Sequence, residues 1–389
     1  MSRPLSACTV SLVLSVLVAA PLPAQEVVSK AAPAAEAPKP RIEIALLLDT
    51  SNSMDGLINQ ARTQLWKMVN ELEGVRHHGQ RPDVYVALYE YGNDGLPSEG
   101  GHIRLVQPLT LNLDKISEEL FALTTNGGSE YCGQVIAKSL DDLQWTDRPG
   151  TMKCIFIAGN EPFTQGSVDY REACKNAAAK NITITTIHCG SYDEGIRGQW
   201  ADGAKLADGQ YLNIDQNKAL PHIEAPQDEE LARLSSALNK TYIPYGTEDA
   251  RKEATARQQA QDSNAAGAAP AVASLRSLTK ASANYRNADW DLVDALKEKT
   301  VELEDVKQEQ LPEELRKLSP EELKAHVEKL TAERSEIQEK IKVLSAARNK
   351  YVAAEQAKLA EAGEDTLDQA VVKAVRAEVD KRGFEFAEE

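Results

Sequence analysis

Aromatic residues are scarce in this chain of 389 residues, and basic residues are outnumbered by acidic ones. Phe, Trp and Tyr make up only 5% of it, whereas hydrophobic residues make up 42% and charged residues 27%. Such a composition can bury a core, and few aromatics beside abundant Ala, Glu and Lys indicate that part of the chain is long helix. The 44 basic residues are outnumbered by 60 acidic ones, for a net charge of -16. Because this excess repels phosphate backbones, it argues against a nucleic-acid partner.

The apolar run near the N-terminus is too short for a membrane anchor. It extends from Val10 to Ala20, about 11 residues, whereas roughly 20 are needed to span a bilayer. Arg3 precedes this run, and Leu22-Pro23-Ala24 follows it as a possible cleavage site. Residues 1–24 are therefore predicted to be a signal peptide, with no transmembrane segment after cleavage. We expect the mature protein to be exported, either periplasmic or secreted.

Cysteines are few, and four of the five would remain after cleavage: Cys132, Cys154, Cys174 and Cys189. In an oxidising compartment they could form one or two disulfides, in any of three full pairings. Alternatively, Cys154 lies in an apolar segment and is a buried free thiol. The sequence does not choose between these interpretations.

The length predicts two folded regions, since a typical domain has about 100–200 residues. Residues 25–40 are rich in Ala and Pro and read as a disordered spacer. An α/β domain is predicted for 41–246, and the polar, Ala-rich segment 247–272 reads as a linker or a loosely held helix. A helical region is predicted for 273–389.

Apolar segments alternate with amphipathic ones throughout residues 41–246. This alternation predicts a doubly wound, mostly parallel, Rossmann-like sheet with helices on both faces. The predicted strands are 42–48, 84–91, 103–109, 154–157, 182–188 and 211–214, and the predicted helices are 57–72, 130–143, 168–180 and 229–238. In such sheets ligands bind beyond the carboxyl ends of the strands.

The C-terminal region contains a heptad pattern. Ser319-Pro320-Glu321-Glu322 predicts a helix start, because Ser can cap, Pro suits the first turn and Glu completes a capping box. Apolar residues then follow a 4-3 alternation that ends near Gly363: Leu323, Val327, Leu330, Ile337, Ile341, Leu344 and Tyr351. Arg334 and Arg348 interrupt it. A shorter helix is predicted from Thr366 to about Gly383.

Two interpretations of this heptad seam are open. The helix could form an intramolecular, coiled-coil-like hairpin with the amphipathic stretch from Trp290 to Leu303. It could instead be a coiled coil for self-association or partner binding. Nearby, Asp289, Asp291 and Asp294 are interpreted as a solvated helix face.

A cluster of oxygen-bearing side chains follows the first predicted strand. Asp49-Thr50-Ser51-Asn52-Ser53 would bring a carboxylate and hydroxyls to one loop, as a small hard dication such as Mg²⁺ prefers. The same residues would also suit an ordinary helix-capping loop. The pattern resembles the Asp-x-Ser-x-Ser motif of von Willebrand factor A (VWA) domains. That resemblance implies a metal-ion-dependent adhesion site (MIDAS) for Mg²⁺ or Mn²⁺, whose shell a partner carboxylate often completes.

Two further loops extend the resemblance. Ser129 in Gly127-Gly128-Ser129-Glu130 would replace the family's Thr ligand, with Glu130 as a possible carboxylate substitute and Thr124 and Thr125 as rivals. In Ala158-Gly159-Asn160-Glu161, Asn160 stands at a usually acidic position, or Gly159 does and the ligand is missing. Either departure removes one negative charge, which Glu130 or Glu161 could restore. The implied metal ligands are Asp49, Ser51, Ser53, Ser129, Glu130 and Asn160.

Catalytic motifs are absent from the sequence. It has no His-Glu-x-x-His spacing, Gly-x-Ser-x-Gly elbow or P-loop. His188 and Cys189 are adjacent, but neighbours on a strand point to opposite faces, which favours a structural cysteine. We therefore expect a non-enzymatic, exported module for cation-dependent protein binding or adhesion in the cell envelope. The alternative is an envelope scaffold that acts through its C-terminal helices and carries a vestigial metal site.

Overall fold

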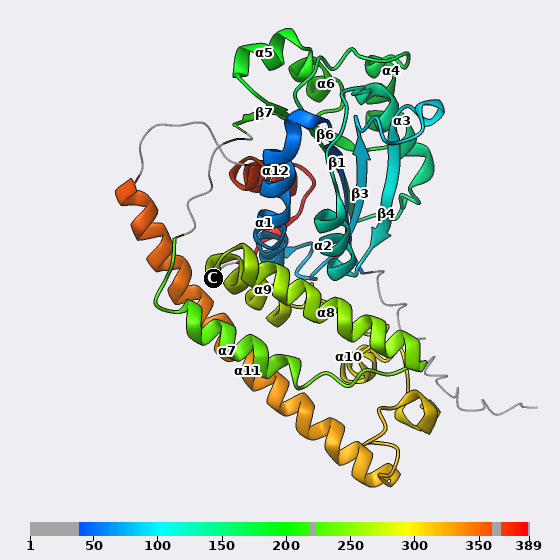
Figure 1. The fold of residues 1–389 in the computed structure, drawn as a ribbon, viewed down its shortest axis with the longest axis vertical. Coiled ribbons are helices and arrows are strands. Elements are labelled where there is room, and N and C mark those ends of the chain that lie inside the picture. The colour runs from blue at the N-terminus through cyan, green and yellow to red at the C-terminus, as the bar shows by residue number, and fades with distance from the viewer. Residues whose placement is uncertain (1–38, 216, 218–222, 360–366, 388–389) are drawn as a thin grey trace, which may run out of the picture. The chain divides into compact units, whose positions relative to one another are not determined.

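A six-stranded sheet forms the centre of the first domain in the computed structural model, which describes residues 39–215, 217, 223–359 and 367–387 (Figure 1). The predicted signal peptide and residues 25–38 of the predicted spacer lie outside the described residues. The strand order is β4-β3-β1-β5-β6-β7. The strands are β1 (Arg41–Asp49), β3 (Asp83–Tyr91), β4 (Ile103–Thr110), β5 (Thr151–Gly159), β6 (Thr183–Cys189) and β7 (Tyr211–Ile214).

All neighbouring strands run parallel except the edge strand β4, which is antiparallel to β3. The parallel strands are almost wholly buried, and every residue of β6 is buried. Strands covered on both faces need apolar side chains at successive positions, which is why they read as continuous apolar runs. The predicted mostly parallel, doubly wound sheet is confirmed.

Helices cover both faces of the sheet. Alternation along β1 sends Ile44 and Leu46 into one core and Ala45 and Leu47 into the other. The first core is covered by α1 (Asp55–Glu71), α2 (Leu113–Ala122) and α12 (Leu367–Lys381). The second is covered by α3 (Cys132–Asp142), α4 (Tyr170–Ala179) and α6 (Trp200–Leu206), with the short α5 (Tyr192–Arg197) before α6.

The C-terminal end of the chain packs against the sheet domain. Figure 1 shows α12 beside α1, and Val375 and Val379 belong to the same buried cluster as Ile44. After α12, β8 (Glu385–Phe386) pairs with β2 (Val75–Arg76), placing Phe386 opposite Val75. Part of the predicted helical region, 273–389, therefore completes the core of the sheet domain.

The segment predicted as a linker or loosely held helix, 247–272, instead contains the packed helix α8 (Glu248–Ala268) and the start of α9 (Pro270–Ala281). The buried side of α8 is largely polar: Gln258 is 4% and Gln261 is 2% exposed. Gln261 accepts a hydrogen bond from Ser117 of α2 at 2.8 Å. Because α8 packs through polar side chains, it lacks the apolar period that normally reveals a buried helix.

The predicted capping box at Ser319 and Glu322 forms, and α11 (Pro320–Leu359) follows it. The apolar seam of α11 packs mainly on α7 (Asp228–Asn239) and α9. The stretch predicted as hairpin partner contains only the short α10 (Leu292–Lys297), which contacts α11 near its start. The prediction named the wrong partner for α11, because α11 packs mainly on α7 and α9 instead of on the stretch from Trp290 to Leu303. Helix α7 lies within the predicted 41–246 domain but packs with the helical region.

Both arginines of the seam are buried in ion pairs. Arg334 pairs with Asp291 and Asp294, and Arg348 pairs with Asp228. Asp291 is 0% exposed, so the prediction of a solvated acidic face was wrong for this residue. The seam thus binds the chain's own aspartates where a regular coiled coil would place apolar residues.

The four cysteines are buried free thiols: Cys132, Cys154, Cys174 and Cys189. The free-thiol interpretation of Cys154 is therefore the one that the structure supports. Among the helices of the described segments, none combines the length and the apolar character needed to cross a bilayer.

Candidate metal site

Three loops converge at the carboxyl edge of the sheet. Asp49 ends β1, Gly159 ends the neighbouring β5, and the loop before α3 crosses beside them. Backbone hydrogen bonds join the first loop to the second: Asn52 N donates to Gly127 O at 3.1 Å, and Asn126 N donates to Thr50 O at 2.9 Å. The edge on which the sequence predicted a ligand site is therefore built from all three predicted loops.

The first loop folds around the Asp49 carboxylate. Ser51 N donates to Asp49 Oδ1 at 2.7 Å, and the Ser51 and Ser53 hydroxyl oxygens lie 3.2 Å apart. Asp49 is 0% and Ser51 is 1% exposed, whereas Ser53 is exposed. A short 3₁₀ turn, Asn52–Met54, then leads into α1. The loop thus presents a buried carboxylate beneath a more accessible hydroxyl.

The second loop contributes Glu130, which is 3% exposed. Its carboxyl group hydrogen-bonds to that of Asp49. Ser129 is half-buried and bridges Gly92 through its backbone. The rival Thr125 donates its hydroxyl to Asp55 at the start of α1, at 2.5 Å, while the rival Thr124 is exposed. Of these residues, Glu130 is the one whose side chain contacts Asp49.

The third loop contributes Asn160. Its amide oxygen accepts from Ser53 Oγ at 3.2 Å when the nitrogen faces the carboxylates. In that orientation the nitrogen lies 3.3 Å from both Glu130 Oε2 and Asp49 Oδ2. Glu161 N donates to Glu130 Oε2 at 3.3 Å, so Glu161 enters through its backbone. Asn160 therefore contacts the cluster directly, where the sequence left Gly159 as an alternative.

Two glycines and a glutamine shape the site; sequence analysis assigned no role to Gly92 or Gln165, and it considered Gly159 only as a position that lacks a ligand. A Cβ on Gly92, where φ is +81°, would lie 2.7 Å from Asp49 Oδ1 and 2.8 Å from Glu130 Cγ. A Cβ on Gly159 would lie 2.5 Å from the Tyr91 hydroxyl. Gln165 accepts from Glu130 N at 3.2 Å and donates to Glu161 at 3.1 Å. These close contacts join distant segments, so no local motif could have revealed them.

The two central carboxyl groups are strongly perturbed. Burial, together with the negative charge of Asp49, raises the pKa of Glu130 well above its ordinary value. Burial also raises the pKa of Asp49, although hydrogen bonds from Glu130 and Ser51 oppose this. Neither group forms an ion pair with a described Lys, Arg or His. Burial and the neighbouring negative charge therefore both favour the protonated form of Glu130.

The residues present fit a hard divalent cation. The cluster offers oxygen ligands from the Asp49 and Glu130 carboxylates and the Ser51 and Ser53 hydroxyls. Asn160 would add its amide oxygen if that atom, rather than the nitrogen, turned toward the carboxylates. Mg²⁺ and similar ions prefer such ligands. A cation would also supply the positive charge that the buried carboxyl pair lacks.

The adjacent His188 and Cys189 occupy buried positions on β6. Cys189 belongs to the core on the α1 face of the sheet, and burial raises the pKa of its thiol well above the ordinary value. The thiol is thus protonated at neutral pH, which weakens it as a nucleophile.

The strand order, the crossing helices and the polar carboxyl edge define a doubly wound α/β domain. Residues 43–226 match the family model of the von Willebrand factor type A domain. This part of the chain is therefore a VWA domain.

Solved structures similar to this chain include BatB, a conserved hypothetical protein from Bacteroides thetaiotaomicron, at 16% identity and a TM-score of 0.35. That match covers 57% of this chain and 99% of BatB. The VWA domain of SpRpn10 is 16% identical with a TM-score of 0.35, over 46% of this chain and 91% of that domain.

A third similar structure is proximal thread matrix protein 1 from the mussel byssus, with a zinc-occupied MIDAS motif. It is 12% identical with a TM-score of 0.34, over 46% of this chain and 43% of that one. A comparison with curated protein sequences gives no match.

Proposed function

We propose that the VWA domain binds Mg²⁺ or Mn²⁺ at its carboxyl edge and presents the ion to an acidic group of a protein partner. The observation that carries this proposal is the pair of buried carboxyl groups, Asp49 and Glu130, which contact each other without a cationic side chain. A dication held by this pair would relieve the cost of burying like charges. The proposal assigns the domain a binding role without a catalytic step.

The chain's own residues divide into a floor and a rim. Asp49, Ser51 and Glu130 are buried and form the floor, whereas Ser53 is exposed and Asn160 is half-buried. Because Asn160 replaces a usual carboxylate, Glu130 would supply the second negative charge of the site once an ion is bound. The open rim leaves room for a carboxylate from the partner to complete the shell. Ser129 completes the proposed ligand set from the second loop.

The location we propose is the cell envelope or the exterior, and it rests on the signal peptide predicted for residues 1–24. An exported binding domain followed by packed helices would suit adhesion or assembly of envelope proteins.

The proposal is tested by titrating Mg²⁺ and Mn²⁺ into the chain from residue 25 onward, in a calorimeter. We expect saturable one-site binding, which Asp49→Asn should abolish because it removes a ligand charge while keeping the side-chain shape. The matched control is Asp249→Asn, since Asp249 is exposed at the start of α8. Wild-type protein that gives no saturable heat would contradict the proposal. Pull-downs from envelope extract with and without chelator then test for a cation-dependent partner.

A second candidate is the envelope scaffold with a vestigial metal site, which Asn160 favours because it removes a charge from the usual ligand set. In that case the chain should sediment as a stable oligomer and bind neither ion. Because most of the hydrophobic seam of α11 packs within the chain, such an oligomer would need another surface.

A further inference from the structure

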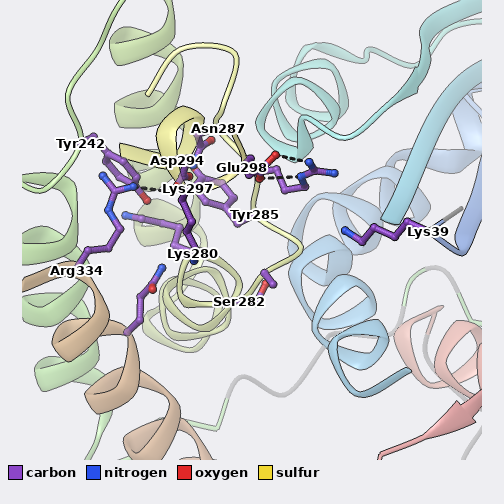
Figure 2. A pocket seen from close by; sticks show the side chains of 13 residues that line it. Lys39, Tyr242, Lys280, Ser282, Tyr285, Asn287, Asp294, Lys297, Glu298 and Arg334 are labelled. Carbon is purple, nitrogen blue, oxygen red and sulfur yellow. Dashed lines mark hydrogen bonds and ion pairs between the residues drawn. The ribbon is translucent and has the colours of Figure 1, made fainter. Parts of the chain in front are cut away.

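A polar cavity of about 330 Å³ lies near the amino end of β1, whereas the candidate metal site lies beyond the carboxyl end of that strand. Lys39, just before β1, lines it from the sheet domain, and the remaining lining comes from α7, α9, α10 and α11 or the segments that flank them (Figure 2). Its volume is at the lower end of the range for small-molecule sites. The cavity therefore has room for one small molecule but not for a macromolecular segment.

The lining of this cavity holds more basic than acidic side chains, and four of its five cations also pair with carboxylates just outside it. Although the net charge of the protein is -16, the acidic side chains that line the cavity are only Asp294 and Glu298. The basic side chains that line it are Lys39, Lys280, Arg286, Lys297 and Arg334. Such a concentration of cations in a concave, partly desolvated surface favours an anionic ligand.

Some of these cations are fully occupied, and others are not. Arg334 uses its guanidinium on Thr241, Asp291 and Asp294. Arg286 donates to Asp83 and Glu298 through three N–H groups, which leaves two of its five for a ligand. Lys297 is exposed and forms no ion pair with the described residues.

A buried donor in the same cavity has no acceptor. Asn287 is 3% exposed, and its Nδ2 has no hydrogen-bond partner among the described residues. Its Oδ1 accepts from Trp290 Nε1 at 3.2 Å, which fixes the amide with its nitrogen turned away from Trp290. Native proteins rarely leave such a group unpaired, so an unpaired donor that lines a cavity points to a ligand acceptor.

We propose that this cavity binds a small organic anion, whose carboxylate or phosphate oxygens accept from Asn287, Lys297 and Arg286. Figure 2 shows Asn287, Asp294 and Lys297 on one side of the cavity and Lys39 on the other. The anion supplies an acceptor for Asn287 and an ion-pair partner for Lys297. This binding is independent of the candidate metal site, with which the cavity shares no residue.

The test titrates succinate and inorganic phosphate separately into the chain from residue 25 onward, in metal-free buffer of low ionic strength. We expect saturable one-to-one binding of at least one of them, and the two arms show whether the site prefers carboxylate or phosphate. Lys297→Met should weaken that binding about tenfold, as expected for one charge-assisted hydrogen bond. Asn287→Asp should abolish it, because it keeps the acceptor for Trp290 but turns the free donor into an acceptor.

Lys324→Met is the matched control. Lys324 is exposed on α11 outside the cavity, and its replacement makes the same change in net charge. It should bind the anion as tightly as the wild type does. If neither anion binds saturably, if Lys297→Met binds like the wild type, or if Lys324→Met weakens binding equally, the proposal is overturned. Because Lys297 is exposed, its variant tests the proposal even if Asn287→Asp fails to fold.

Discussion

Replacing Arg334 with leucine would complete the heptad pattern of α11, and we predict that it destabilises the protein. The pattern alone suggests the opposite, because leucine is the residue that a regular apolar seam would carry at this position. In the structure Arg334 is 4% exposed. It donates to Asp291 Oδ2 at 2.6 Å, to Asp294 Oδ1 at 2.7 Å and to Thr241 Oγ1 at 3.0 Å.

The predicted loss of stability comes from the carboxylates of Asp291 and Asp294, which would remain in place without the arginine that pairs with them. Removing one partner of a buried ion pair costs about 3–5 kcal/mol, because the remaining charge is left without compensation. Asp291 would keep hydrogen bonds from Ile243 N at 2.7 Å and Asp294 N at 3.0 Å. These bonds reduce the penalty, so we expect the free energy of unfolding to fall by about 3 kcal/mol, the lower end of that range.

Urea denaturation followed by circular dichroism measures this change as a lower midpoint. Lys340→Leu is the control, because Lys340 is exposed on the same helix and, among the described residues, forms an ion pair with Glu336 alone. It should change stability by no more than about 0.5 kcal/mol. A midpoint for Arg334→Leu equal to or above that of the wild type would refute this account of the buried pairs.

Two further outcomes follow from the site and from the buried base Lys280. Gly92→Ala should weaken Mn²⁺ binding in calorimetry, because its Cβ would meet Asp49 Oδ1 at 2.7 Å; Gly79→Ala, also at positive φ but with nothing within 4 Å, should leave binding unchanged. Burial lowers the pKa of Lys280 to about 8 from 10.5. As pH rises, Lys280 therefore loses its proton in the folded protein before it does so in the unfolded chain. The free energy of unfolding should increase between pH 8 and pH 10.5, by about 3 kcal/mol at most. Urea midpoints across that pH range should rise less steeply in Lys280→Met, and equal slopes would contradict the assignment.

The sheet was predictable because its strands are apolar at successive positions. Strand β5, for instance, is apolar and buried from Cys154 to Ala158, and burial on both faces leaves this mark in the sequence. Helix α8 was not predictable as a packed helix, since Gln258 and Gln261 form much of its buried side. Its neighbours in space, such as Ser117, are far away in the sequence.

The candidate site also contains some residues that the sequence predicted and others that it did not. The first loop was found through the local motif Asp49-Thr50-Ser51-Asn52-Ser53, and Glu130 and Asn160 were placed by analogy with that motif's family. The structure brings these side chains within contact of one another. The contribution of Gly92 depends on the space between two carboxyl groups from different loops, which local sequence does not encode.

The C-terminal region is more than a spacer after the VWA domain. The family match ends at residue 226, yet Val375, Val379 and Phe384 share a buried cluster with the strands and with α1. Helices α9 and α12 both contact α1, the helix that begins directly after the candidate metal loop. The core that holds this helix in place therefore includes residues from both ends of the described chain. Removing the C-terminal helices would expose an apolar face of the sheet domain, so the remaining domain would not be intact.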